Sequence, residues 1–227
     1  MLRIDQKTLA AAIEHTLLLP TATGDQIERH CEQAIEYGFH GVCINSRWID
    51  LAADKLQGTG VKAVTVVDFP LGASSTEVKV ANVRQAIFEG ADEVDMVADL
   101  AAIVEGDSKY ILAQLRSVMR VCRAMRPSVI LKVIIETAAL TNEQKRFACR
   151  VAQMAGVDFI KTSTGLHPAG GATVEDVALL KSEAPNCKIK ASGGISTLEK
   201  ALAMLEAGAD RIGTSSAVQI MQELAGR

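Results

Sequence analysis

The sequence has no strong excess of charge of either sign. Its 24 lysines and arginines are balanced by 27 aspartates and glutamates, which gives a net charge of -3 at pH 7 and a pI of about 5.8. Nucleic-acid binding requires clustered lysines and arginines that release counterions from the phosphate backbone. We therefore expect no nucleic-acid partner, and any anionic ligand must be bound by a small local site.

The cysteines and histidines form no recognisable disulfide or metal pattern. The five cysteines are odd in number, widely spaced and include no CxxC pair, so we expect reduced thiols rather than disulfides or a zinc site. The four histidines show no HxH or HExxH spacing, which favours hydrogen-bonding or surface roles. They are His15, His30, His40 and His167. We expect a mechanism that uses no metal and no other cofactor.

Long apolar runs are also missing. No segment approaches the ~20 apolar residues that a membrane-spanning helix needs, and residues 1–15 mix charges too closely for a secretory signal. We therefore expect a soluble, cytoplasmic protein with no membrane partner. The 227 residues, 48% of them hydrophobic, can bury one substantial core, and we expect a single domain over 1–227.

Short β-rich apolar runs alternate with amphipathic stretches along the whole chain. This alternation is typical of βα units around a parallel sheet, and eight such units predict an α/β fold of the (β/α)8 TIM barrel class. The expected strands are Ile13 to Leu19, Gly41 to Asn45, Val61 to Asp68, Glu93 to Ala98, Val129 to Glu136, Phe159 to Ser163, Lys188 to Ser192 and Arg211 to Thr214. The expected helices include Asp25 to Tyr37, Glu77 to Glu89, Lys109 to Met125, Asn142 to Ala155 and Leu198 to Ala207.

Three helix-to-strand turns have the same composition. The segments FEGADEVDMV, MAGVDFIKTS and EAGADRIGTS each carry a glycine, then alanine or valine, then aspartate before a strand. Glycine suits the left-handed position that ends a helix. The recurrence therefore indicates repeated structural units rather than chemistry.

Four polar residues within or at the ends of expected strands are candidates for catalysis. They are Asp95, Lys132, Lys161 and Lys190. In such barrels catalytic groups project from the carboxyl ends of the strands. A lysine in a strand covered on both faces needs a polar cavity or an ionic partner. A lone strand lysine is more often a structural ion-pair partner, and Asp95 is as readily explained as such a partner as by a proton-relay role.

Lys161 and Lys190 lie at the ends of adjacent expected strands, which favours a catalytic amine. A free lysine has a pKa of about 10.4, and lowering it to about 7 corresponds to about 4.6 kcal/mol. A second cation and desolvation can together supply such a shift. We therefore predict that Lys190 keeps Lys161 neutral, so that its amine can attack a carbonyl.

Two glycine-bearing turns suggest a phosphate site. Residues 192–196 read SGGIS after the seventh expected strand, and residues 213–216 read GTSS after the eighth. A Gly-Gly pair is often just a turn. Backbone N–H groups at helix starts can, however, bind phosphate without a basic patch. The position of the two turns after strands seven and eight fits such a phosphate site. The implied ligand is a phosphorylated sugar.

Taken together, these motifs resemble the deoxyribose-phosphate aldolase family from about Ile13 to Ala217. The resemblance is carried by IEHTLL, GVCIN, DFPLG, GADEVDMV, LKVIIET, FIKTSTG, GGATVEDV, KASGGI and RIGTSSA in that order. It implies a class I aldolase that cleaves 2-deoxy-D-ribose 5-phosphate to glyceraldehyde 3-phosphate and acetaldehyde. Its ligands would be a phosphorylated sugar and a short aldehyde, and a homodimer would be expected.

The resemblance also implies roles for individual residues. Lys161 would form the Schiff base, Lys190 would perturb its pKa, and Asp95 would move protons with Lys190 and a water molecule. Lys132 would belong to the same polar cluster. The region that holds the phosphate and sugar would comprise Thr164, Gly165, Gly193, Gly194, Ser215 and Ser216.

Several positions depart from the family pattern. Glu14 precedes His15 and Thr16 where an aspartate is usual, so the carboxylate reaches one methylene further. Leu19 replaces a common lysine, Asp68 a usual glycine, and the loop LHPAGGAT is one residue longer than in a shorter family version. Cys43, at the end of the second strand, is either a small buried hydrophobe or a residue facing the aldehyde. Two alternatives remain: a Schiff-base barrel for another phosphorylated aldehyde or ketone, and a non-catalytic sugar-phosphate-binding barrel.

Overall fold

The computed structural model describes residues 4–125 and 127–226, and within them eight parallel strands close into a barrel. Each strand pairs with the next in the chain, and β8 pairs with β1. The strands are β1 (Ile13–Leu17), β2 (Gly41–Ile44), β3 (Lys62–Val67), β4 (Glu93–Val97), β5 (Ile130–Ile134), β6 (Phe159–Lys161), β7 (Lys188–Ser192) and β8 (Arg211–Thr214). This confirms the predicted (β/α)8 barrel.

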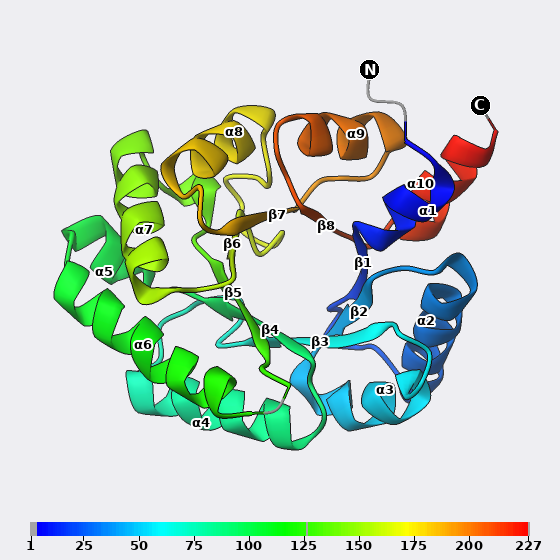
Figure 1. The fold of residues 1–227 in the computed structure, drawn as a ribbon, viewed down its shortest axis with the longest axis horizontal. Helices are drawn as coiled ribbons and strands as arrows, with labels where there is room; N and C mark the ends of the chain where they lie inside the picture. Colours follow the sequence, from blue (N-terminus) through cyan, green and yellow to red (C-terminus); the bar gives the residue numbers. More distant parts are fainter. Residues whose placement is uncertain (1–3, 126, 227) are drawn as a thin grey trace.

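Helices form the outer ring of the barrel (Figure 1). They are α1 (Gln6–Ala11), α2 (Gly24–Tyr37), α3 (Ile49–Leu56), α4 (Thr76–Phe88), α5 (Leu100–Glu105), α6 (Ser108–Ala124), α7 (Asn142–Ala155), α8 (Val174–Glu183), α9 (Leu198–Glu206) and α10 (Ala217–Ala225), with short 3-10 turns at Ser46–Trp48 and Thr137–Ala139. The first and last helices, α1 and α10, lie side by side in Figure 1. No helix in the described part of the chain is long and apolar enough to cross a membrane.

Several strands end earlier than the sequence predicts. The first ends at Leu17 rather than Leu19, and the sixth at Lys161 rather than Ser163. The third and fifth stop before Asp68 and Glu136, whose φ angles are 52° and 53°. A residue in this left-handed conformation cannot continue an extended ladder, so the chain turns out of the barrel wall there. The remaining strand and helix limits agree with the predicted ones to within two residues.

The three recurring turns share one structural role. In each, the glycine has a positive φ and the aspartate two residues later accepts the backbone N–H of the preceding strand at 2.9 Å. The pairs are Gly90 with Asp92, Gly156 with Asp158, and Gly208 with Asp210. The repeated turn therefore connects neighbouring strands by a hydrogen bond at the amino-terminal end of the barrel. This agrees with the prediction that the repeat has a structural rather than a chemical role.

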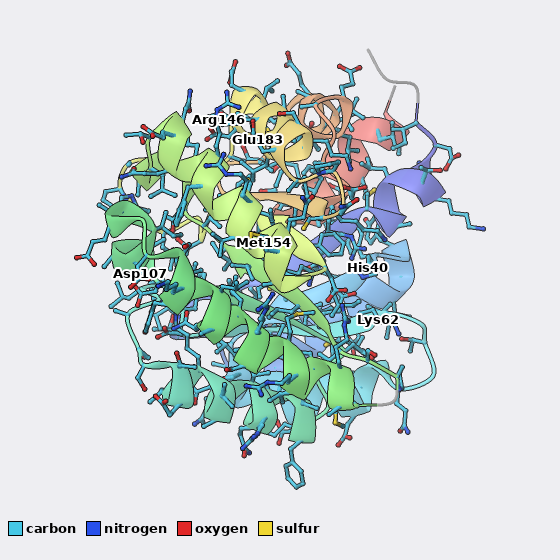
Figure 2. The ribbon with its side chains drawn as sticks, turned by 60° about the vertical axis from the view of Figure 1, so that its left-hand side comes forward. His40, Lys62, Asp107, Arg146, Met154 and Glu183 are labelled. Atoms are coloured by element: carbon cyan, nitrogen blue, oxygen red, sulfur yellow. The ribbon has the colours of Figure 1, made fainter. Side chains whose placement is uncertain are left out.

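Apolar packing occurs both outside and inside the barrel wall. The main core lies between strands and helices and includes Val42 and Ile44 of β2. Because successive strand side chains point to opposite faces, Cys43 points inward, where it packs with Val64 and Val66. The outer surface is held by polar contacts, such as the ion pair between Arg146 on α7 and Glu183 on α8 (Figure 2). The inner wall at β2 and β3 is thus apolar, and charged side chains such as Glu14 on β1 and Asp95 on β4 enter the interior from the neighbouring strands.

Candidate active site

Three lysines enter the barrel interior from adjacent strands. Lys132 on β5, Lys161 on β6 and Lys190 on β7 are each at most 2% exposed. The parallel register pairs Asp95 with Lys132 and Lys161 with Lys190 across neighbouring strands. Since side chains in register point to the same face of a sheet, closing the barrel gathers these four groups into one cluster.

Asp95 is the centre of the cluster. Its Oδ1 accepts a hydrogen bond from Lys132 Nζ at 2.9 Å, and its Oδ2 accepts from Lys161 Nζ at 2.8 Å and from Lys190 Nζ at 2.6 Å. Complete burial opposes ionisation, but the ammonium groups of Lys132, Lys161 and Lys190 outweigh it and hold the Asp95 pKa well below its usual range. Asp95 is therefore a permanent carboxylate near neutral pH, oriented by three donors.

Glu14 is the second carboxylate that pairs with Lys190, in addition to Asp95. It forms buried ion pairs with Lys190, with Lys132 at 3.3 Å and with Arg211 at 3.3 Å. Burial opposes the charge on Lys190, but the carboxylates of Asp95 and Glu14 raise its pKa above the usual value. Lys190 is consequently a cation that lies between two carboxylates.

A third carboxylate, Glu93, extends the cluster toward the amino-terminal end of the barrel. Its Oε2 lies 2.6 Å from Lys132 Nζ, and its Oε1 lies 2.7 Å from His40 Nε2. Burial opposes the charge on Lys132, but its carboxylate partners raise the pKa of Lys132 above the usual range. In Figure 2, His40 lies near Lys62, at the end of the molecule where β2 and β3 begin. A continuous chain of hydrogen bonds and ion pairs thus runs from His40 to Lys161.

Lys161 is the member of the cluster that reaches the substrate-sized pocket. A cavity of about 390 Å³ opens at the carboxyl ends of the strands, and Lys161 lines it while Asp95, Lys132 and Lys190 lie behind it. The pocket also contains seven other residues that the sequence singled out: Thr16, Thr164, Gly165, Gly193, Gly194, Ser215 and Ser216. The predicted amine and the predicted phosphate turns are therefore brought together.

The pocket walls around Lys161 are uncharged. Of the described residues that line it, only Lys161 has a charged side chain. The polar lining consists of hydroxyls and glycine backbone, and α10 begins beside it with Ser216 as N-cap. Leu19 and Leu166 stand at the rim, where they are 59% and 62% exposed. Such a wall can bind an anion through backbone N–H groups and a helix start, without a basic side chain.

Two residues that the sequence left open lie outside this pocket lining. Cys43 is fully buried in the apolar interior cluster, and burial raises the pKa of its thiol. Asp68 accepts hydrogen bonds from the Ser74 hydroxyl at 2.7 Å and N–H at 3.0 Å, and it lies 3.3 Å from buried Lys79. Cys43 is thus packed as a small hydrophobe, and Asp68 stabilises the loop after β3.

The chain resembles known proteins along nearly its whole length. A model of the DeoC/LacD family aldolases matches residues 1–223. The chain belongs to this family. It is 47% identical over 216 residues to the deoxyribose-phosphate aldolase of Caldanaerobacter subterraneus subsp. tengcongensis, which covers 95% of this chain and 93% of the relative.

Other comparisons agree with this family membership. The deoxyribose-phosphate aldolase of Dictyoglomus turgidum is 49% identical over 217 residues, covering 95% of this chain and 97% of that protein. Among solved structures, the tetrameric deoxyribose phosphate aldolase of Aeropyrum pernix superposes with a TM-score of 0.90 at 29% identity, covering 97% of this chain and 92% of that one. The family resemblance inferred from the motifs is thereby confirmed.

Sequence reasoning missed three buried charged residues of this family member. Glu93 and Arg211 belong to the ion-pair cluster, and Glu136 accepts hydrogen bonds from Thr164. A signal for Glu93 existed, because it precedes Asp95 by two residues in the same strand and must share its face. Arg211 opens its strand, and its partner Glu14 is far away in the sequence, so spacing alone could not reveal that contact.

Two groups in the cluster have the geometry of potential metal ligands. Glu14, Cys43 and Asp95 form one, and Glu14, His40 and Glu93 form the other, with ligand atoms within 4.8 Å of one another. The carboxylates of both groups are already paired with the buried ammonium groups of lysines. A divalent cation would have to displace these lysines, so the donor set fits an ion-pair network better than a metal site.

Proposed function

We propose that this chain is a deoxyribose-phosphate aldolase, a lyase that reversibly cleaves 2-deoxy-D-ribose 5-phosphate to D-glyceraldehyde 3-phosphate and acetaldehyde through a Schiff base on Lys161. The observation that carries the proposal is that Lys161 alone among the clustered lysines lines the pocket. The names of relatives at 47% and 49% identity support the reaction. The amine and the phosphate turns line the same pocket, as this substrate requires.

The arrangement of charges sets Lys161 apart from the other basic side chains of the cluster. Three carboxylates of the cluster face four basic side chains. The acids are Glu14, Glu93 and Asp95, and the bases are Lys132, Lys161, Lys190 and Arg211. Three cations neutralise three carboxylates, and a fourth would be an excess buried charge. Lys161 is the base that lines the pocket, so its amine is the one that can reach and attack a carbonyl.

In the cleavage direction, Lys161 Nζ attacks C1 of the open-chain sugar phosphate and loss of water forms a protonated imine. Asp95 Oδ2, which touches both Lys161 and Lys190, takes part with Lys190 and a water molecule in removing the proton of the C3 hydroxyl. The C2–C3 bond then breaks, its electrons pass to the iminium nitrogen, and glyceraldehyde 3-phosphate leaves. Protonation of the enamine and hydrolysis release acetaldehyde and restore Lys161. Lys132 holds Asp95 in place through Oδ1.

The uncharged pocket wall would bind the rest of the substrate. We assign the phosphate and sugar to Thr164, Gly165, Gly193, Gly194, Ser215 and Ser216, with Thr16 beside them. Glu14 replaces a shorter family carboxylate, and its ion pair with Lys190 supports an intact relay. This contact argues against the non-catalytic alternative, because the longer side chain still reaches the cation.

Cellular location and assembly are further parts of the proposal. All five cysteines are buried free thiols, which supports a reducing compartment such as the cytoplasm. A homodimer is expected from the family resemblance. Light scattering of the purified protein tests it, and a monomer would contradict it.

Trapping with sodium borohydride tests the reaction class and the residue together. Incubation with 2-deoxy-D-ribose 5-phosphate and borohydride should leave a reduced adduct on Lys161 that peptide mass spectrometry locates. A folded protein that binds the sugar phosphate but gives no adduct would contradict the proposal. An adduct without acetaldehyde release would instead favour a Schiff-base aldolase for another phosphorylated aldehyde or ketone, which a panel of donors and acceptors would identify.

A further inference from the structure

Glu136 occupies an unusual position directly after β5. It is only 1% exposed, and its φ of 53° lies in the left-handed region that non-glycine residues rarely adopt. Such a conformation persists where surrounding contacts hold it, and it often accompanies a functional constraint. The contacts of its carboxylate show what is being held.

The carboxylate binds one residue of the loop that follows β6. The Thr164 N–H donates to both carboxylate oxygens at 3.2 Å, and the Thr164 hydroxyl donates to Oε2 at 2.6 Å. The Thr164 Oγ1 in turn accepts the N–H of Leu166 at 3.1 Å. A buried carboxylate that accepts several hydrogen bonds is a strong anchor, because hydrogen bonds to an ionised acceptor exceed those between neutral groups. Residues 164–166 are therefore fastened to the end of β5.

The same loop is held on its other side by the turn after β7. A Cβ built on Gly171 would lie 2.3 Å from the carbonyl oxygen of Gly193, so the two backbones are in direct contact. The Ala172 N–H donates to the carbonyl oxygens of Ser192 and Gly193, both at 3.1 Å. The loop is thus attached at Thr164 to Glu136 and at Ala172 to the turn after β7, and Gly165 lies against Gly193.

We propose that Glu136 is a positioning residue for substrate binding, which holds Thr164 and Gly165 at a set distance from Gly193 so that they receive the phosphate-bearing end of the substrate together. Glu136 does not line the pocket, whereas Thr164, Gly165 and Gly193 do. Its effect therefore passes through Thr164. This inference rests on the proposed function for the identity of the ligand. The attachment of residues 164–166 to Glu136, which we call the clamp, depends only on the hydrogen bonds described above.

Three substitutions separate the backbone role of Glu136 from that of its carboxylate. Glu136→Gln keeps the reach and one acceptor oxygen, Glu136→Asn tolerates the left-handed backbone but is one methylene too short, and Glu136→Gly accepts the backbone and removes the side chain. For 2-deoxy-D-ribose 5-phosphate, we expect Asn and Gly to raise KM about tenfold, with kcat within about twofold, and Gln to raise KM about threefold or less. The proposal would be overturned if the Asn and Gly variants had the KM of the wild type. It would also be overturned if their kcat fell about tenfold, as much as KM is expected to rise.

A second measurement does not depend on catalysis. Hydrogen exchange at the amides of Thr164 and Leu166 should be faster in Glu136→Asn than in Glu136→Gln, while exchange in the barrel strands stays unchanged. Equal exchange in the two variants would overturn the clamp even in a protein without aldolase activity. If the wild type fails to release acetaldehyde but this difference appears, the proposed function fails and the clamp stands.

Thr164→Val gives an independent approach should the Glu136 variants fold poorly. It removes the hydroxyl that donates to Glu136 and leaves the glutamate in place. If the contact matters, adding Glu136→Gln to Thr164→Val should change KM less than Glu136→Gln does alone. Fully additive effects on KM would contradict the proposal.

Discussion

The candidate site consists of two regions that are built differently. The deep region is a cluster of charged side chains on the strands, in which Asp95, Lys132 and Lys190 are completely buried. The shallow region is the pocket wall of hydroxyls and glycine backbone on the loops after β1, β6, β7 and β8. The charged side chains lie on strands, whose position is set by the hydrogen bonds of the barrel sheet. The groups expected to bind substrate lie on loops, whose backbone N–H groups are not used in the sheet.

This difference predicts unequal tolerance to substitution. Removing one partner of a buried ion pair leaves an uncompensated charge and costs about 3–5 kcal/mol. Removing a neutral hydrogen bond costs about 0.5–1.5 kcal/mol. Changes in the cluster should therefore abolish chemistry or stability, and changes in the pocket wall should mainly weaken binding.

The largest effect is expected for Lys161→Arg. The guanidinium cannot form the imine, so acetaldehyde release should fall by about 10⁴-fold or more, as for loss of other catalytic nucleophiles. Borohydride trapping should give no adduct. Lys188→Arg is a matched control, because Lys188 lies at the exposed start of the neighbouring strand, and it should retain activity. An adduct in Lys161→Arg would place the nucleophile elsewhere.

Lys190→Leu is expected to have the next largest effect. It removes the cation beside Lys161 and leaves Glu14 without one of its partners, so kcat/KM at pH 7 should fall about 10²–10³-fold with Lys161 in place. The double variant Lys190→Leu with Glu14→Gln should recover thermal stability but not activity, because both buried charges are then absent. Near-normal activity in Lys190→Leu at pH 7 would show that Lys190 does not set the state of Lys161.

Ser215→Ala tests the shallow region with a smaller expected effect. Loss of one neutral hydroxyl contact to the phosphate should raise KM by about three- to tenfold and leave kcat within about twofold. Steady-state kinetics with 2-deoxy-D-ribose 5-phosphate measure both constants. Ser182→Ala serves as a control, since its hydroxyl bonds only to Leu179 O on the outer helix α8. A large fall in kcat for Ser215→Ala would contradict the expectation that the pocket wall acts mainly on substrate binding and the cluster on chemistry.

The smallest expected effect concerns a buried pair that carries no charge. His15 and His30 stack with ring centroids 3.4 Å apart, and burial, followed by repulsion from His15 when it is protonated, lowers the pKa of His30 to about 3. The unfolded chain binds a proton near pH 6.5, above the folded value, so the free energy of unfolding should decrease as the pH falls from about 6.5 toward 3. Between pH 6 and 5 this amounts to about 1 kcal/mol for one histidine.

Urea denaturation at several pH values tests this dependence. His30→Asn should reduce the slope of stability against pH in this range by about one proton. An unchanged slope would show that His30 does not titrate as its burial predicts. The Asp95 carboxylate should add to the loss of stability only below about pH 5, where the unfolded carboxyl begins to bind a proton and the folded one, with its lowered pKa, does not.

Much of the fold could be predicted because it depends on local patterns. Alternating apolar runs indicated the eight units, and glycine followed by aspartate indicated their repeated turns. The strand ends at Asp68 and Glu136 could not be predicted, because their left-handed conformations depend on partners such as Ser74 and Thr164 from neighbouring loops. The apolar, β-branched runs that precede them indicate a strand but do not show where its extended conformation ends.

By itself the sequence determined the barrel class, the presence of Lys161 and Lys190 on adjacent strands, and the two glycine turns beside them, because each follows from spacing along the chain. Only the tertiary structure decided which lysine opens to the pocket and which carboxylates surround the others. Glu14 and Lys190 are separated by 176 residues, and Glu14 and Arg211 by 197. Closure of the barrel brings β1 against β8, and this closure, rather than any local motif, completes the charge balance around Lys161.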